Sequence, residues 1–300
     1  MANQYSGTIL EFKDLLEKNK LFSYPSYRNQ LCPRYGILWG NLILAYLFLM
    51  GMFIITSRIR PNNEIFLFIS SVIITAILIG FVIYEFALIL HAASHFNLLK
   101  NKVHNDILTN IFVAIFFGQS VEVYRQIHFR HHKYLGTDLD PENSYRIKLD
   151  MVFIFKSITG LHFLTKFFFK NKNSEFNHFI FLTIAINVFI LSFSAYFKNW
   201  IFFLSWPIAV TIFFPFFSDL RLIVEHRSTS DSGVCVTKYF PNKFSCIFGA
   251  SGFNFHLLHH WDPSLHFSNL REATAELINQ KIFTDSPCKY SSEIKILLRK

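Results

Sequence analysis

The run ILWGNLILAYLFLMGMFIIT, residues 37–56, contains no charged side chain and is long enough to cross the hydrocarbon core of a bilayer. Three further stretches have the same character: 65–90, in which Glu85 is the only charge, 179–197 and 201–217. The sequence therefore predicts four transmembrane helices. Residues 106–119 include the apolar run NIFVAIFFG, which is too short to span and is predicted to be buried or re-entrant.

The composition agrees with residence in a membrane. Hydrophobic residues make up 52% of the 300 residues, phenylalanine alone contributes 38, and charged residues make up only 16%. A soluble domain of this size needs more charge to cover its surface. No repeat or linker divides the chain, so we expect one domain over residues 1–300, built as an all-α integral membrane protein with its four spans in two hairpins.

Basic residues set the expected orientation. They concentrate in the N-terminal arm and in the segment between the second and third spans, whereas the two loops that close the hairpins hold only Arg58, Arg60 and Lys198. Basic segments stay in the cytoplasm, so both termini and the central segment are predicted to face inward. The first 36 residues are polar and mixed in charge, so we expect no cleavable signal peptide. The net charge of +9 suits anionic headgroups or an acidic protein partner, and we expect no nucleic-acid partner.

Other segments give weaker signals. The four cysteines are scattered without CxxC spacing, which argues against a disulfide framework or a zinc knuckle. The stretch 151–170 mixes apolar residues with lysines and is predicted to be an amphipathic helix in the membrane interface. Residues 271–280, REATAELINQ, are predicted to form a surface helix.

Histidines carry the chemical signal. Of thirteen, eight fall in three tight clusters: HAASH with His91 and His95, HFRHH with His128, His131 and His132, and HLLHH with His256, His259 and His260. On a helix, residues at i, i+3 and i+4 share one face, so each cluster can direct several imidazoles to one place. Each cluster alone is weak evidence, because interfacial histidines are often merely hydrogen-bonded. Three together, beside apolar spans where a bare imidazole is costly, predict metal ligation.

The ligand count indicates two ions. Eight imidazoles exceed the needs of one tetrahedral zinc, and the chain has neither the HExxH of a zinc protease nor the His–Cys mixture of a deaminase. A di-iron site that activates dioxygen is the best inference, although the ligands alone do not separate iron from zinc or another metal.

The three clusters, their spacing and the stretch NFHLLHHWDP, residues 254–263, resemble the histidine boxes of the membrane fatty acid desaturase family and its hydroxylase and ketolase relatives. The resemblance runs from the second span to Pro263. It implies four membrane helices capped by a helical cytoplasmic domain that holds a histidine-rich di-iron site, with an acyl chain entering a buried tunnel.

The resemblance also implies a further ligand before the third cluster, for which His226 is the candidate. Acyl-CoA desaturases often place an asparagine four residues earlier, but this chain has Leu222 there, so that subgroup is not matched. Four residues are possible supports of the ligands: Asn254, through water or merely as a helix cap; Asp138 and Asp140, or a simple turn; and Glu225, or a solvated carboxylate. No catalytic residue is expected beyond the metal ligands.

We therefore expect an oxidoreductase that uses two iron ions (Fe²⁺), O2 and two external electrons to introduce a double bond into a fatty acyl chain. The alternative is a hydroxylase or ketolase of an alkane, carotenoid or other lipid on the same scaffold. A third class is a non-catalytic membrane carrier or sensor of metal, against which the convergence of three clusters argues. The chain has no haem-binding or iron–sulfur segment, so a separate ferredoxin or cytochrome is predicted to supply electrons.

Overall fold

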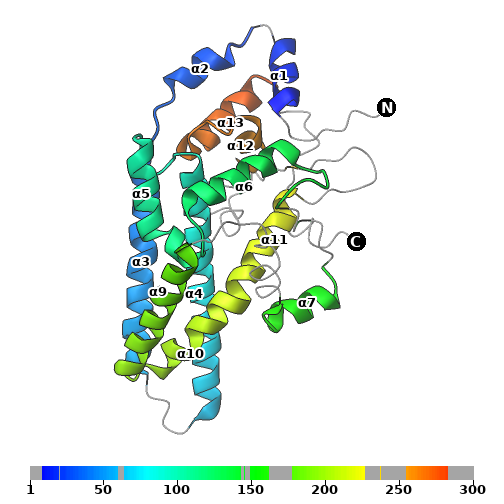
Figure 1. The fold of residues 1–300 in the computed structure, drawn as a ribbon. Coiled ribbons are helices and arrows are strands. Elements are labelled where there is room, and N and C mark those ends of the chain that lie inside the picture. The colour runs from blue at the N-terminus through cyan, green and yellow to red at the C-terminus, as the bar shows by residue number, and fades with distance from the viewer. Residues whose placement is uncertain are drawn as a thin grey trace.

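The computed structural model describes residues 9–19, 21–59, 64–142, 145, 149–161, 178–226, 237 and 255–282. Within these ranges every regular element is a helix (Figure 1). The expectation of an all-α protein is confirmed for this part of the chain.

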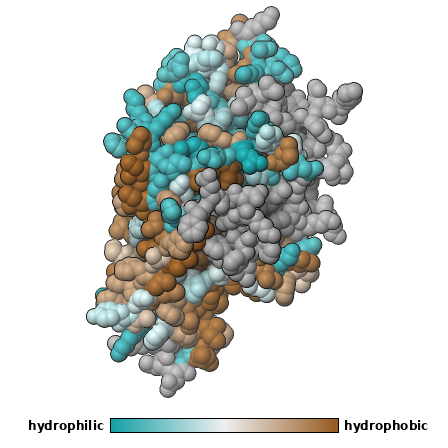
Figure 2. Space-filling view, viewed as in Figure 1, coloured by the Kyte–Doolittle hydropathy of each residue, from teal (hydrophilic) through white to brown (hydrophobic). Residues whose placement is uncertain are grey.

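The described residues contain four helical stretches that are long and apolar enough to cross a membrane, as predicted. They are α3 (Tyr35–Arg58), α4 (Ile65–Ser94), α9 (His178–Tyr196) and the continuous helix Trp200–His226. Apolar side chains on these helices lie largely exposed, as lipid contact requires, and Figure 2 shows apolar surface gathered over the half of the molecule that they occupy. The chain is therefore built as a multi-pass membrane protein.

Helix α4 is the central element of the bundle. It packs against α3 and also against all three parts of the last span, which are α10 (Trp200–Ile208), a π-helical turn η3 (Ala209–Phe213) and α11 (Phe214–His226). At the crossing, a Cβ added to Gly80 would meet the Cβ of Phe213 at 2.5 Å. A glycine is required there because any larger residue would push the two helices apart.

Two shorter helices follow α4. Asn101 caps α5 (Lys102–Phe112) by accepting a hydrogen bond from the backbone N–H of His104, and Ser120 caps α6 (Val121–Tyr134) through that of Val123. The apolar run between them forms the single turn η1 (Ala114–Phe116), and the axes on either side differ by 85°. The bend carries α6 across the end of α4.

Five short helices cover the end of the bundle where α4 and α11 terminate (Figure 1). They are α1 (Ile9–Lys18), α2 (Tyr24–Gln30), α12 (His256–Trp261), η6 (Phe267–Asn269) and α13 (Leu270–Asn279). Phe12 stacks on Trp261, and Arg28 forms an ion pair with Asp262. The N-terminal arm therefore packs against the segment of the third histidine cluster. Figure 2 shows a hydrophilic surface over this region.

Two further helices expected from the sequence are present, the second over part of its range. The helix predicted at 271–280 is more than a surface helix, because one face of α13 buries Leu270, Ala273 and Leu277 in the core. In the predicted interfacial segment 151–170, α7 (Met151–Ile158) is helical, with Phe153 buried and Met151 and Phe155 exposed, while residues 162–170 lie outside the described residues.

Candidate metal centre

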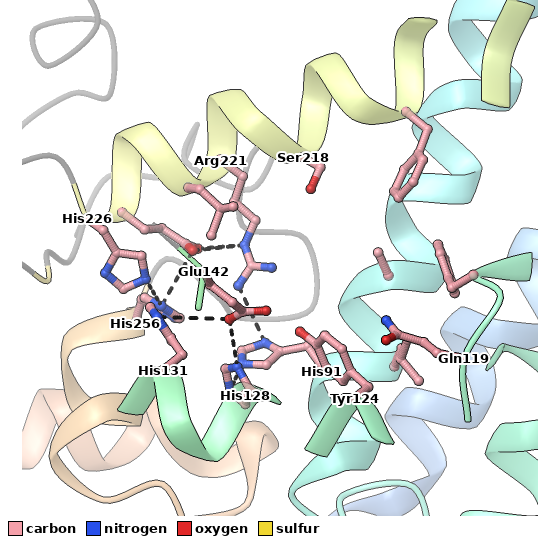
Figure 3. Close-up of a pocket in the computed structure, with 16 residues that line it drawn as sticks. His91, Gln119, Tyr124, His128, His131, Glu142, Ser218, Arg221, His226 and His256 are labelled. Atoms are coloured by element: carbon pink, nitrogen blue, oxygen red, sulfur yellow. Dashed lines mark hydrogen bonds and ion pairs between the residues drawn. The ribbon is translucent and has the colours of Figure 1, made fainter. Parts of the chain in front are cut away.

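Four helices bring nine histidines together. The first cluster ends α4, the second lies on α6, the third forms most of α12, and His226 is the last residue of α11. The last span thus continues beyond residue 217, where the hydropathy pattern ends, and its extension delivers His226. Figure 3 shows side chains from α4, α6, α11 and α12 pointing toward one another.

The nine histidines divide into two groups. The first contains His91, His95, His128, His132 and His259, whose possible ligand atoms all lie within 4.8 Å of one another. Its Nε2 atoms form a chain of close approaches: His91 to His128 at 2.7 Å, His128 to His132 at 2.9 Å, and His132 to His259 at 3.2 Å.

The second group contains His131, His226, His256 and His260. The ligand atoms of His131, His226 and His260 lie within 4.8 Å of one another. His256 joins them because its Nε2 is 2.9 Å from Nε2 of His226 and 3.1 Å from Nε2 of His260. In each HxxHH motif the two consecutive histidines belong to different groups: His132 and His259 to the first, His131 and His260 to the second.

These contacts fit two metal ions better than hydrogen bonds between imidazoles. Nε2 of His128 approaches two other Nε2 atoms, as does Nε2 of His256, yet one ring nitrogen has either a single proton or a single in-plane lone pair. Donors about 2.1 Å from a shared ion lie about 3.0 Å apart at a right angle and about 3.4 Å apart at the tetrahedral angle. In addition, Nε2 of His95 is buried without a hydrogen-bond partner. The donor set therefore suits two ions.

Carboxylates orient two of the rings from outside. Nδ1 of His131 lies 2.9 Å from Asp140, and Nδ1 of His128 lies 3.1 Å from Glu142. Asp140 is fully enclosed and also accepts a hydrogen bond from Tyr145. A carboxylate on the outer nitrogen fixes a proton there and turns the other nitrogen toward the metal.

The predicted supporting residues thus have different positions. Asp140 contacts a histidine of the second group, whereas Asp138 is exposed, and Asn254 lies outside the described residues. Sequence reasoning did not single out Glu142, although its place two residues after Asp140 in GTDLDPE was a usable signal.

Burial disfavours the protonated form of four of these histidines, which lie outside the spans. It lowers the pKa values of His256, His259 and His260 well below the usual value, and neighbouring imidazoles lower them further. The pKa of His95 falls to about 3, chiefly through burial and then through the positive charge of Arg125. Neutral imidazole is the form that binds metal, so these residues are ready to act as ligands.

An ion pair on α11 borders the second group. Arg221 donates through Nε to Oε1 of Glu225 at 2.9 Å, one helical turn away, and both side chains are buried. The carboxylate of Glu225 approaches the group itself, with Oε2 3.5 Å from Nε2 of His256. Arg221 was not identified from the sequence, although an arginine and a glutamate four residues apart at the end of an apolar helix are an unusual pair.

A cavity of ≈ 150 Å³ opens beside both groups. Its polar wall includes Gln119, Tyr124 and Ser218 together with Glu142 and Arg221 (Figure 3). Its apolar wall comes from the spans and their neighbours: Ala87, Leu90, Phe117, Phe214 and Leu222. A substrate held here would lie directly against the imidazoles.

A second ion pair connects the helices that carry the first two histidine clusters. Arg125 of α6 donates to both carboxylate oxygens of Asp106 in α5, at 2.6 and 2.9 Å, and to the backbone carbonyl of Ser94 at the end of α4, at 2.6 Å. It links the helix that carries the second cluster to the last turn of the helix that carries the first.

Fold and site together define a helical membrane protein with a buried, histidine-rich centre whose side chains could hold metal. The model of the fatty acid desaturase family matches residues 68–289, more than half of the chain. The protein therefore belongs to the fatty acid desaturase family, as the histidine boxes predicted. The members of this family are oxidoreductases.

Proposed function

We propose that the protein is a di-iron desaturase that introduces a double bond into a fatty acyl chain. The reaction removes two hydrogen atoms from neighbouring carbons and consumes one O2, two electrons and two protons, giving the alkene and two molecules of water. Membership of the family supports the reaction class. The observation that carries the proposal is the convergence of nine histidines into two groups beside a cavity.

Two iron ions bound to these groups would supply the activation of dioxygen needed to cleave an unactivated C–H bond. His91, His95, His128, His132 and His259 would hold one ion, and His131, His226, His256 and His260 the other. Asp140 and Glu142 hold protons on Nδ1 of His131 and His128, so both rings present Nε2 to the centre. The apolar wall of the cavity would position the chain and exclude water.

Electrons would come from a separate acidic ferredoxin or cytochrome. His95 supports this proposal because it also lines a second pocket, of ≈ 280 Å³, whose walls include Arg28, Tyr35 and His266. None of these three residues lines the cavity beside the metal groups. A donor docked at this pocket would reach a proposed ligand without entering the substrate cavity.

We further propose that the four spans form two hairpins, with both termini and the metal centre in the cytoplasm. The distribution of lysine and arginine supports this orientation. The helices outside the bundle would then form the cytoplasmic cap.

The polar wall of the cavity favours one alternative, a hydroxylase or ketolase. Gln119, Tyr124 and Ser218 offer hydrogen bonds next to the proposed centre, and an unfunctionalised acyl chain uses none of them. A carotenoid or another lipid with a polar group near the reacting carbon would use them.

Product analysis tests the proposal and separates the two reactions. The protein is expressed with an electron-transfer system in a host of simple lipid composition, and a His131→Ala variant serves as the control. A new lipid lighter by two hydrogen atoms, made only by the unaltered protein, is expected. A product that gains an oxygen atom instead would reject desaturation in favour of the alternative.

A further inference from the structure

Glu225 differs from the other carboxylates at the proposed metal centre in the atom that it faces. Asp140 and Glu142 contact Nδ1 of their histidines, the nitrogen turned away from the centre. Glu225 instead approaches Nε2 of His256, the nitrogen that also faces His226 and His260. It therefore lies on the metal side of the ring and cannot act as an outer support for it.

The distances suit a shared ion. Oε2 of Glu225 is 3.5 Å from Nε2 of His256, close to the ~3.4 Å that separates two donors on a tetrahedral ion. One donor atom each from Glu225, His226 and His256 lies within 4.8 Å of the others. The first group has five histidines and the second has four, so the second has room for another donor.

The surroundings prepare this oxygen for a cation. Only 4% of Glu225 is exposed, and Oε2 is buried without accepting a hydrogen bond, although it lies 2.9 Å from Nε of Arg221. Nε of Arg221 lies close to both oxygens but donates its hydrogen bond to Oε1, while Oε2 faces Nε2 of His256. Imidazoles are neutral ligands, so a carboxylate here would also offset part of the charge of two buried divalent ions.

We propose that Glu225 is an oxygen ligand of the second metal ion, held in place by Arg221. The inference rests on the two-metal centre of the proposed function. The second ion then has a mixed ligand set of four histidines and one carboxylate, and the first has histidines alone. Arg221 acts as a positioning residue that fixes the carboxylate through Oε1.

Metal titration separates this role from a structural one. Metal-free full-length protein in detergent is titrated with Co²⁺, and its absorption and bound metal are recorded for the unaltered chain and for Glu225→Gln. The matched control is Glu142→Gln, which removes a carboxylate on an outer nitrogen of the first group. We expect Glu225→Gln to weaken binding of the second ion about tenfold or more with little change in the first, and Glu142→Gln to weaken the first.

A measurement on the unaltered chain guards against misfolding of the variant. With ¹³C-labelled glutamate, the infrared difference spectrum on adding Co²⁺ should show a shifted carboxylate band in the second step of the titration. If no glutamate band responds, or if Glu225→Gln binds both ions with unaltered affinity, Glu225 is not a ligand and the nine-histidine centre still stands. An unaltered chain that binds no ion overturns both proposals.

Discussion

The ion pair between Arg125 and Asp106, which connects the helices of the first two histidine clusters, gives the sharpest test of the architecture. In Arg125→Met, three charge-assisted hydrogen bonds from α6 to Asp106 and Ser94 are lost. The side chains of Arg125 and Asp106 are only 14% and 18% exposed, so Asp106 is left largely buried without its counter-charge. Breaking a buried pair costs about 3–5 kcal/mol, and the remaining exposure places this one near the lower end, at about 3 kcal/mol.

Thermal unfolding of the purified metal-free protein measures this cost. At roughly 2 °C per kcal/mol for a chain of this size, the Tm should fall by about 6 °C. The first metal group should also weaken, because Arg125 links α6 to the last turn of α4. Arg130→Met, an exposed arginine on the same helix, is the matched control and should change neither quantity. Equal behaviour of the two variants would refute the view that Arg125 aligns the clusters.

Three further expectations concern the centre and the bundle. Asp140→Ala should weaken binding at the second group about 10- to 100-fold, because His131 loses the carboxylate on Nδ1; competition with a chelator measures this, and unaltered affinity would contradict it. The metal-free protein should lose stability as pH falls below about 6.5. Burial lowers the folded-state pKa of His256, His259 and His260, so protons bind the unfolded chain preferentially; a Tm that is flat from pH 8 to 5.5 would argue against buried neutral histidines. Gly80→Ala should cost about 1–3 kcal/mol, because its Cβ would meet that of Phe213; a Tm equal to that of the unaltered protein would show that α4 and η3 can separate freely.

Much of this architecture could be predicted from the sequence because the thickness of the bilayer sets the length of a spanning helix. An apolar run of about 20 residues predicts a span, and all four predicted spans are present. The rule fails at the ends of helices. The hydropathy pattern placed the end of the fourth span at residue 217, but α11 continues to His226. Polar side chains on its last turns line the cavity beside the histidine groups, so the helix continues although its apolar character ends.

The histidine clusters were predictable for a related reason. HxxHH spacing puts three imidazoles on one helical face, so their convergence follows from helix geometry. The assignment of each histidine to one of two groups did not follow, because it depends on how α6, α11 and α12 pack. The same holds for Glu225. The sequence places it next to His226 but does not give the direction of its side chain, and the structure shows Oε2 facing Nε2 of His256.

The number of iron ions that the unaltered chain binds is the most direct test of the proposed centre. Metal-free protein is loaded anaerobically with Fe²⁺, separated from unbound iron and assayed for iron and protein. We expect two ions per chain, falling toward one in His226→Ala, where the second group loses a ligand. A centre built from two histidine groups would be contradicted if the unaltered chain retained no iron. It would also be contradicted if the unaltered chain bound a single ion and His226→Ala still bound it.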